Sequence, residues 1–271
     1  MEDGVDRALR FLEALVKLLP QAPYMRVFIS SQPIPQWKDF LSSHCLSVDL
    51  DDYIGPEVQK DIHAYFESLQ NDTYKKDEEV VATIPLIASQ ANGSFIYART
   101  MFKLLEQSRE DYLQSVNSAK EITGQDALSK VYSHLVDKAL RSVATPSLRV
   151  QLYDAVLAMT CLRSALSLAE VCTLLDIGSK AGHLDRFLQE FSSVLHSGPD
   201  KQMHFVHNSF KDFLQERVSS PDTGPSTLAR PSPHHMIASR LLRLMMEKSH
   251  RSSRDAISGA LEYACLYWYI I

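Results

Sequence analysis

The sequence predicts a mainly helical protein in which the remnant of a parallel α/β sheet precedes a helical bundle, a winged-helix domain and a C-terminal helical segment. Three observations predict this fold class. Apolar residues recur at helical spacing through most of the 271 residues, and glycine is scarce. Apolar runs rich in β-branched and aromatic residues occur near the N-terminus. An alternating pattern that brackets a turn occurs between residues 193 and 206.

Residues 1–55 have the pattern of the end of an α/β domain. A helical apolar stripe over residues 5–19 is followed by the apolar run Met25–Ile29, which Pro33 ends because proline cannot donate to a strand ladder. The segment Cys45–Leu50 alternates like a second strand. Helix, strand, short helix and strand is the order of a parallel α/β unit, and two strands alone do not form a stable sheet. We therefore expect only the residual end of such a domain here.

Residues 56–145 are predicted to form a helical bundle. Pro56 suits the first position of a helix, and Asn92-Gly93 is typical of a helix C-terminus. Residues 71–79 are polar and predict a loop. The predicted helices span residues 56–69, 80–91, 94–106 and 126–142.

Residues 146–218 predict a winged-helix domain. Ser167 and Glu170 form a capping box that begins the second of three helices, which are predicted at 147–162, 168–175 and 183–191. Residues 193–196 and 202–206 can pair as a hairpin around Ser197–Asp200, and another helix follows. Three helices, a hairpin and a helix is the winged-helix order.

The last part of the chain begins with a linker. Residues 219–233 hold four Pro, four Ser, two Thr and one Gly, a composition typical of loops. Helical spacing returns at residues 234–248 and 254–271. Residues 234–271 are therefore predicted to start a C-terminal helical domain.

Composition excludes several classes of protein. The net charge is −5 and the sequence pI is about 6.1, so no overall basic field attracts nucleic acid or anionic membranes. The four cysteines form no CxxC pair, which fits a reducing compartment. The N-terminus lacks the features of a signal peptide, and no apolar run approaches the ~20 residues of a membrane helix. We expect a cytoplasmic protein without membrane contacts.

Motifs for catalysis and metal binding are missing. The sequence contains no G-x-x-x-x-G-K-[ST] phosphate loop and no G-x-S-x-G nucleophile elbow. His204 and His207 are three residues apart on a predicted strand, which directs their rings to opposite faces. We therefore predict no catalytic residue and no metal site.

DNA recognition by the predicted winged helix is disfavoured by its charges. The candidate recognition helix, residues 183–191, carries two acidic residues and one arginine, whereas base and phosphate contacts need Lys, Arg, Asn or Gln. A winged helix that binds proteins fits these residues better.

His207 lies where the predicted strand 202–206 meets the next helix. Its imidazole is close to backbone N–H groups that a helix N-terminus leaves unpaired. The residues alone favour a capping role, with ligand binding as the alternative.

Several segments in order resemble one protein family. They are Ser30-Ser31-Gln32-Pro33 after the predicted strand, NGSFIYA (92–98), LSLAEVCTLL (166–175), SSVLHS (192–197), HFVHNSFKDFL (204–214) and ALEYACLYW (260–268). From about Phe11 to Trp268 the chain resembles the C-terminal portion of a fungal NACHT-type STAND NTPase, of the NLR-like group that carries WD40 repeats.

The resemblance implies an architecture and a set of nucleotide contacts. In that family a P-loop sheet is followed by a helical bundle and a winged helix, and exchange of ADP for ATP permits oligomerisation. Ser31, Gln32 and Pro33 match the sensor-1 segment, in which the family usually has arginine where this chain has Gln32. Gly93 and Phe95 match a segment near the base, and His207 matches a contact to the β-phosphate.

The chain also departs from the family. The Walker A loop is absent, and the Walker B strand is reduced at most to residues 2–6. Without backbone amides and a lysine, little compensates the phosphate charges, so ATP, ADP or GTP with Mg²⁺ is expected only if a P-loop is supplied from elsewhere. We expect a truncated gene model, a degenerate paralogue or a split protein.

Three functional hypotheses follow. The first is a non-catalytic fragment of a signalling NTPase that regulates through protein partners or self-association. The second is part of a nucleotide-dependent oligomerisation switch whose P-loop lies upstream. The third is a winged-helix nucleic-acid binder.

Overall fold

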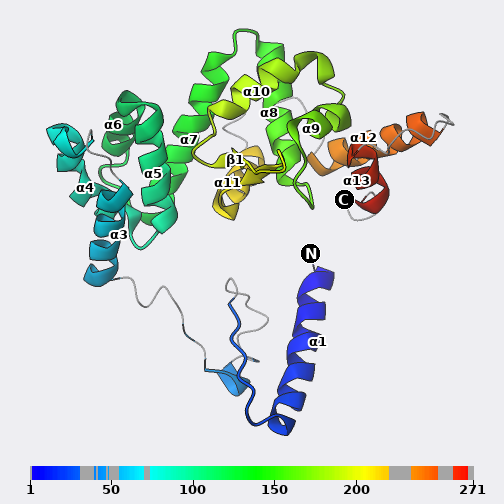
Figure 1. The fold of residues 1–271 in the computed structure, drawn as a ribbon, viewed down its shortest axis with the longest axis horizontal. Helices are drawn as coiled ribbons and strands as arrows, with labels where there is room; N and C mark the ends of the chain where they lie inside the picture. The colour runs from blue at the N-terminus through cyan, green and yellow to red at the C-terminus, as the bar shows by residue number, and fades with distance from the viewer. Residues whose placement is uncertain are drawn as a thin grey trace. The chain divides into compact units, whose positions relative to one another are not determined.

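A computed structural model shows a mostly helical chain, and its described residues contain a small two-stranded antiparallel sheet (Figure 1). The chain divides into two compact units, Met1–Tyr53 and Ile54–Ile271. The structure describes residues 2–30, 40, 42–46, 48, 55–69, 74–219, 233–249 and 259–267.

In the first unit, the predicted helix is confirmed and the predicted strands are not. Helix α1 spans Glu2–Leu18, and a 3-10 turn follows at Leu19–Gln21. Residues 25–30 lie in no strand, and Phe28 is 94% exposed. The prediction of a strand at Met25–Ile29 was wrong, because an apolar run becomes a strand only where a neighbour pairs with its backbone.

The second predicted strand, Cys45–Leu50, lies only partly within the described residues. Cys45, Leu46 and Val48 are described and lie in no strand, and Leu46 is 94% exposed. The part of the chain that the structure describes therefore contains no parallel sheet. Residues 31–33 and the linker residues 220–232 lie outside it.

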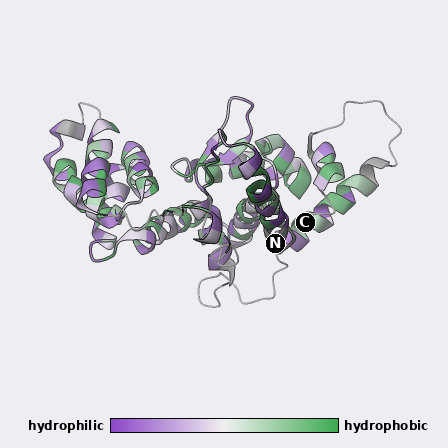
Figure 2. Ribbon diagram, turned by 90° about the horizontal axis from the view of Figure 1, so that it is seen from below, coloured by the Kyte–Doolittle hydropathy of each residue, from purple (hydrophilic) through white to green (hydrophobic). Residues whose placement is uncertain are grey.

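The predicted bundle helices are confirmed. They are α3 (Pro56–Leu69), α4 (Glu78–Ala91) and α5 (Phe95–Gln107), to which the structure adds a 3-10 turn at Tyr74–Lys76 and the unpredicted α6 (Arg109–Ser118). Helix α3 packs on α4 and α5, and α5 packs on α6. Hydrophobic and hydrophilic residues are mixed along the helices (Figure 2).

Local hydrogen bonds fix the ends of α4. The Asp77 carboxylate accepts the Val80 N–H at 3.2 Å, and the Arg109 guanidinium that donates to it at 2.6 Å lowers the pKa of Asp77 to about 2. At the other end, Asn92 and Gly93 have φ values of 43° and 87°. The prediction that Asn92-Gly93 ends this helix is confirmed.

Helix α7 (Gly124–Ser142) joins the bundle to the rest of the second unit. It packs on α4, α5 and α6 and also on α10 and α11. Lys138 on α7 lies 2.8 Å from the Asp111 carboxylate of α6 and 3.1 Å from that of Glu190 at the end of α10. This ion-pair network links three helices in a partly buried setting.

The following helices surround a hairpin. They are α8 (Pro146–Thr160), α9 (Leu168–Leu175), a 3-10 turn at Gly178–Lys180, α10 (Ala181–Gln189) and, after the hairpin, α11 (Asn208–Ser219). Strands β1 (Leu195–Ser197) and β2 (Met203–Phe205) pair antiparallel, with His196 opposite His204. The predicted capping box at Ser167 and Glu170 and the predicted hairpin are both confirmed. Helices α12 (Pro233–Ser249) and α13 (Gly259–Tyr267) pack on each other and on α9.

A cluster of aromatic rings fills the core between α7, α10 and α11. The Phe210 ring centroid lies 5.0 Å from that of Tyr132 and 5.7 Å from that of Phe191. Phe187 contacts Phe191, and Phe213 contacts Tyr132. Because these rings come from separate helices and meet at buried positions, they hold α11 and the hairpin against α7.

Three buried tyrosines predict alkaline instability. Burial raises the pKa of Tyr112 and of Tyr132 to about 12 and also raises that of Tyr97. In the unfolded chain these hydroxyls lose their protons near pH 10, whereas in the folded chain they lose them at higher pH. The free energy of unfolding is therefore highest below about pH 10 and falls as the pH rises toward 12. Each tyrosine with a pKa near 12 contributes about 2–3 kcal/mol to this fall. Denaturant titrations from pH 8 to 12 measure it, and a flat profile would contradict it.

No helix in the described part of the chain combines the length and the apolarity that crossing a membrane requires.

Candidate functional site

His207 lies between β2 and α11 and caps the helix. Its Nδ1 accepts the Ser209 N–H at 3.1 Å, which is the bond an N-cap side chain makes to the second helical residue. The same Nδ1 lies 2.8 Å from Ser209 Oγ, which in turn lies 2.8 Å from the Tyr132 hydroxyl on α7. The capping role favoured by the sequence is thus present, within a chain of contacts that extends into the core.

The hydrogen bonds assign the tautomer of His207. Because Nδ1 accepts an amide proton, the proton of the neutral ring is placed on Nε2. His207 is an exposed residue. Its Nε2–H is therefore the group that a ligand at the start of α11 would meet.

The other residues predicted to contact a nucleotide lie at the junction of α4 and α5. Gly93 follows Asn92, the C-cap of α4, and Phe95 begins α5 with 44% of its surface exposed. The Phe95 ring packs edge-on against Tyr65 of α3, with centroids 5.5 Å apart. Ser31, Gln32 and Pro33 lie outside the described residues.

The structure assigns these predicted contacts to different groups of helices. Helices α4 and α5 pack on α3, α6 and α7, whereas α11 packs on α7, α8 and β2. Gly93 and Phe95 thus belong to the bundle, whereas His207 belongs to the hairpin–helix part, which consists of β1, β2 and α11. Helix α7 packs on both, and the Gln107 side chain at the end of α5 also donates a hydrogen bond to Ser192, just before β1, at 2.8 Å.

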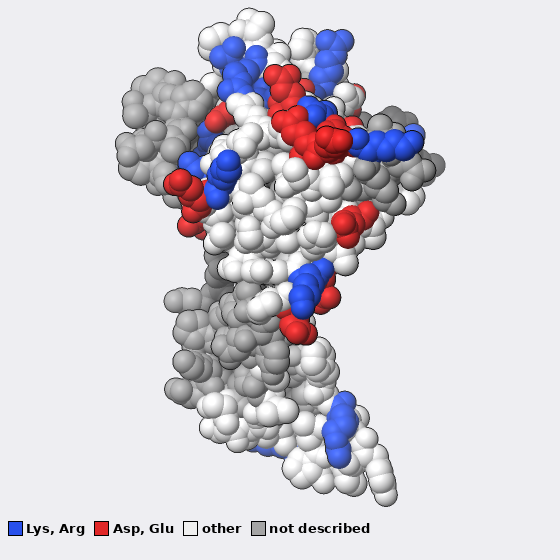
Figure 3. Space-filling view, turned by 90° about the vertical axis from the view of Figure 1, so that its left-hand side faces the viewer, with Lys and Arg blue, Asp and Glu red and all other residues white. Residues whose placement is uncertain are grey.

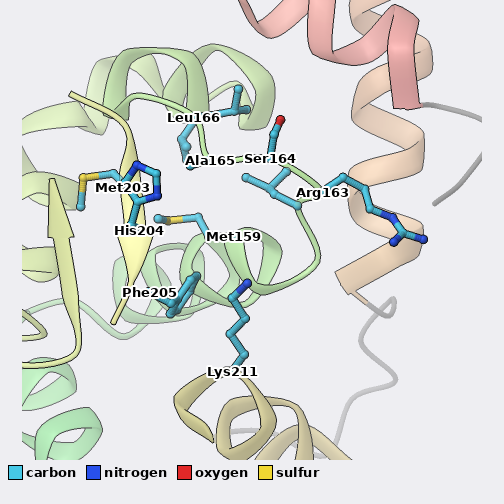
Figure 4. Close-up of a pocket in the computed structure, with 11 residues that line it drawn as sticks. Met159, Arg163, Ser164, Ala165, Leu166, Met203, His204, Phe205 and Lys211 are labelled. Carbon is cyan, nitrogen blue, oxygen red and sulfur yellow. The ribbon is translucent and has the colours of Figure 1, made fainter. Parts of the chain in front are cut away.

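An open pocket of about 160 Å³ lies beside the first turns of α11 (Figure 4). Its walls are the end of α8, the loop between α8 and α9, strand β2 and Lys211, which is one helical turn after His207. Seven of its eleven lining residues are apolar and four are polar. The lining residues are Met159, Leu162, Arg163, Ser164, Ala165, Leu166, Val171, Met203, His204, Phe205 and Lys211. Sequence reasoning missed this pocket, because no motif marks residues that meet from three separate segments.

The histidines of the hairpin have separate roles. His204 stacks on His196 of β1 with ring centroids 5.6 Å apart, and its Nε2 lies 3.8 Å from the Asp200 carboxylate. His207 instead caps α11. In the described residues no group of three or more His, Cys, Asp or Glu side chains is arranged to hold a metal ion.

The four cysteines are free thiols. Burial raises the pKa of Cys161 and of Cys172 above the usual value. Since the thiolate is the nucleophile, burial makes these two thiols less reactive. Their environments give no support to a catalytic cysteine.

Comparisons with protein-family models, with curated proteins and with solved structures found no match.

The capping role of His207 predicts different effects for two substitutions. His207→Ala removes the acceptor for the Ser209 N–H and is expected to lower the free energy of unfolding by about 1 kcal/mol. His207→Asn keeps an N-cap acceptor and is expected to retain most of that stability. Urea denaturation of both variants measures the difference. Equal losses from the two would contradict the capping role.

Proposed function

We propose that this chain is a non-catalytic regulatory module related to the C-terminal portion of NACHT-type STAND NTPases, and that it acts in the cytoplasm through protein contacts. The observation that carries the proposal is the use of His207 as the N-cap of α11. The side chain that the resemblance assigns to a β-phosphate already has a structural partner in Ser209. Its presence is thus explained without a nucleotide.

The arrangement of residues 146–219 supports the family relationship. Helices α8, α9 and α10, the β1–β2 hairpin and α11 follow one another in winged-helix order. The bridge between Ser167 and Gln202 adds the segment before α9 to the outer side of the hairpin, as a third short strand does in winged helices. This geometry agrees with the domain that the resemblance implies.

Electrostatics support the non-catalytic role. A nucleotide triphosphate needs several backbone N–H groups and a cation to compensate its charge. A single imidazole donor contributes only about 1–3 kcal/mol to phosphate binding. We therefore propose that His207 alone does not retain ADP or ATP tightly.

A nucleotide-dependent switch is the second candidate. The exposed position of His207 favours it, because the Nε2–H can donate to a phosphate without breaking the cap. In that case another polypeptide or an upstream segment supplies the P-loop and the Mg²⁺ ligands.

Nucleic-acid binding has less support. The exposed residues of α10 are Gly182, His183, Asp185, Arg186 and Gln189, in which one acid offsets one arginine. Glu190 at the end of this helix pairs with Lys138. On the side of the bundle helices, which Figure 3 shows, Lys and Arg side chains are likewise interspersed with Asp and Glu. Phosphate backbones select basic surfaces, which these mixed charges do not form.

A titration with a fluorescent ADP analogue tests the proposal. The full chain is mixed with the analogue in the presence and in the absence of Mg²⁺, and ATP hydrolysis is assayed in parallel. We expect no submicromolar binding and no hydrolysis, with His207→Ala indistinguishable from the wild type. Submicromolar binding that needs Mg²⁺ and is lost in His207→Ala would establish the nucleotide switch instead.

A further inference from the structure

We propose that the pocket beside α11 binds an extended acidic peptide that inserts one apolar side chain beside Lys211. This inference deepens the proposed interaction role and rests on it. It names the chemistry of the partner, which the sequence left open. The size of the pocket, its charge and a free strand edge support it independently.

The pocket has room for one apolar side chain. The pocket measures about 160 Å³ and is open to solvent, and an enclosed apolar cavity of roughly 150 Å³ holds a benzene ring, so its volume suffices for one side chain. Met159 and Met203 contribute flexible, polarisable side chains, which can adapt to different occupants. Leu166 and Val171 are buried and provide a fixed wall.

The charge at the pocket is positive. Lys211 projects toward the pocket in Figure 4, and its Nζ lies 5.1 Å from the centre of the Phe205 ring. Arg163 belongs to the opposite wall, and its side chain extends outward beside α12. No carboxylate lines the pocket, and among the described residues neither cation has a carboxylate partner. On a chain with a net charge of −5, this local excess of cations selects an acidic partner.

Glu170, the residue before the lining residue Val171, does not line the pocket and is engaged elsewhere. Its carboxylate accepts the N–H of Ser167 at 2.8 Å and the Ser167 hydroxyl proton at 2.7 Å. Both bonds belong to the capping box of α9. The ammonium group of Lys211 lies over the Phe205 ring, and no ion pair among the described residues engages it, so it is available to an incoming carboxylate.

Strand β2 offers main-chain groups at the same place. The Gly198 N–H donates to the Gln202 carbonyl, and the Val206 N–H donates to the Val194 carbonyl. In an antiparallel pair, residues that bond to the partner strand alternate with residues whose N–H and C=O groups point away from it. The N–H and C=O groups of Met203 and Phe205 therefore point away from β1. On that outer side, Met203 N–H donates to the Leu166 carbonyl at 2.9 Å.

Phe205 is the next residue of β2 whose main-chain N–H and C=O point away from β1. Among the described residues, no main-chain group forms a hydrogen bond with them on that side. An extended peptide can pair with Phe205 there, as in other cases of strand addition. This free edge favours a peptide over a compact small molecule.

A peptide selection on the intact chain tests the inference. Random heptapeptides displayed on phage are selected against the immobilised protein, and the consensus is resynthesised with a fluorescein label for anisotropy titration. We expect an apolar residue flanked by Asp or Glu, with binding that weakens as salt is raised. Failure to enrich any peptide, or a consensus without acidic residues, overturns the inference.

Three variants assign the binding to this pocket. Lys211→Glu reverses its charge and is expected to weaken binding about tenfold or more, and Ala165→Trp is expected to fill the pocket with a similar loss. Lys130→Glu makes the same charge change at an exposed position of α7 that does not line the pocket, and serves as the matched control. Circular dichroism checks that each variant is folded. Binding that survives Lys211→Glu and Ala165→Trp overturns the inference.

Two further results distinguish a failure of the pocket assignment from a failure of the proposed non-catalytic function. A single-stranded oligonucleotide that displaces the peptide more effectively than unlabelled peptide does would assign the pocket to phosphate chemistry and overturn the inference. Tight Mg²⁺-dependent ADP binding would overturn the proposed function whatever the peptide result. A failed peptide selection with no ADP binding overturns only the pocket assignment.

Discussion

Replacing Phe210 with alanine is expected to lower the free energy of unfolding by about 3–5 kcal/mol. The Phe210 side chain is 1% exposed and contacts the rings of Tyr132, Phe191 and Phe213. Its removal leaves a cavity where α7, α11 and the segment after α10 meet, and the neighbouring rings cannot collapse into it without moving a helix. Of the single substitutions considered, this one is expected to have the largest effect.

Denaturant unfolding of Phe210→Ala and of a matched variant measures this effect. Phe95→Ala removes the same atoms from a residue that is 44% exposed, and is expected to cost about 1 kcal/mol. Similar losses from both variants would show that the ring cluster does not hold the hairpin–helix part together.

Replacing Gln90 with leucine is expected to cost about 2–4 kcal/mol. Gln90 on α4 is 1% exposed, accepts the Tyr97 hydroxyl proton at 2.8 Å and donates from Nε2 to the Val116 carbonyl at 3.1 Å. Leucine keeps the approximate size but leaves the buried Tyr97 hydroxyl without its acceptor and removes one of two donors to the Val116 carbonyl, which also accepts the Ala119 N–H at 3.3 Å. The cost arises from these lost hydrogen bonds and not from lost apolar contact.

A double-mutant cycle measures how much of this cost comes from the hydrogen bond between Gln90 and Tyr97. Tyr97→Phe removes the hydroxyl, so the combination with Gln90→Leu is expected to cost less than the sum of the single substitutions. Gln125→Leu, at an exposed position of α7, serves as the control and is expected to change stability by less than about 0.5 kcal/mol. Strict additivity of Gln90→Leu and Tyr97→Phe would contradict the network.

Local signals in the sequence predicted most of the described fold. The capping box at Ser167, the Asn92-Gly93 helix end and the hairpin around Ser197–Asp200 each depend on residues close in sequence, and all three are present. Such features are decided by a few neighbouring residues. They can therefore be predicted without knowledge of the tertiary contacts.

Two errors have the same physical origin. Helix α6 was missed because its buried residues include Ser115 beside Tyr112 and Val116, which gives a weak apolar stripe. The segment Met25–Ile29 was predicted as a strand because its residues suit one, although a strand also needs a partner distant in sequence. In both cases tertiary contacts decide the outcome.

The candidate site was predictable only in part. The position of His207 at a strand-to-helix junction followed from the change in apolar spacing. The contact of Ser209 with Tyr132 did not, because 77 residues separate them. The pocket was also hidden, since residues of the α8–α9 loop, β2 and α11 meet only in the folded chain.

Nitrogen-15 NMR of the His207 imidazole, recorded during titration with ADP and Mg²⁺, tests the central claim most directly. The predicted spectrum shows an unprotonated Nδ1 and a protonated Nε2, and neither signal moves at micromolar ADP, because Nδ1 is held by the Ser209 N–H and the sequence contains no phosphate loop to compensate the phosphates. A shift of the Nε2 signal that saturates at submicromolar ADP and requires Mg²⁺ would contradict the account and identify His207 as a nucleotide ligand.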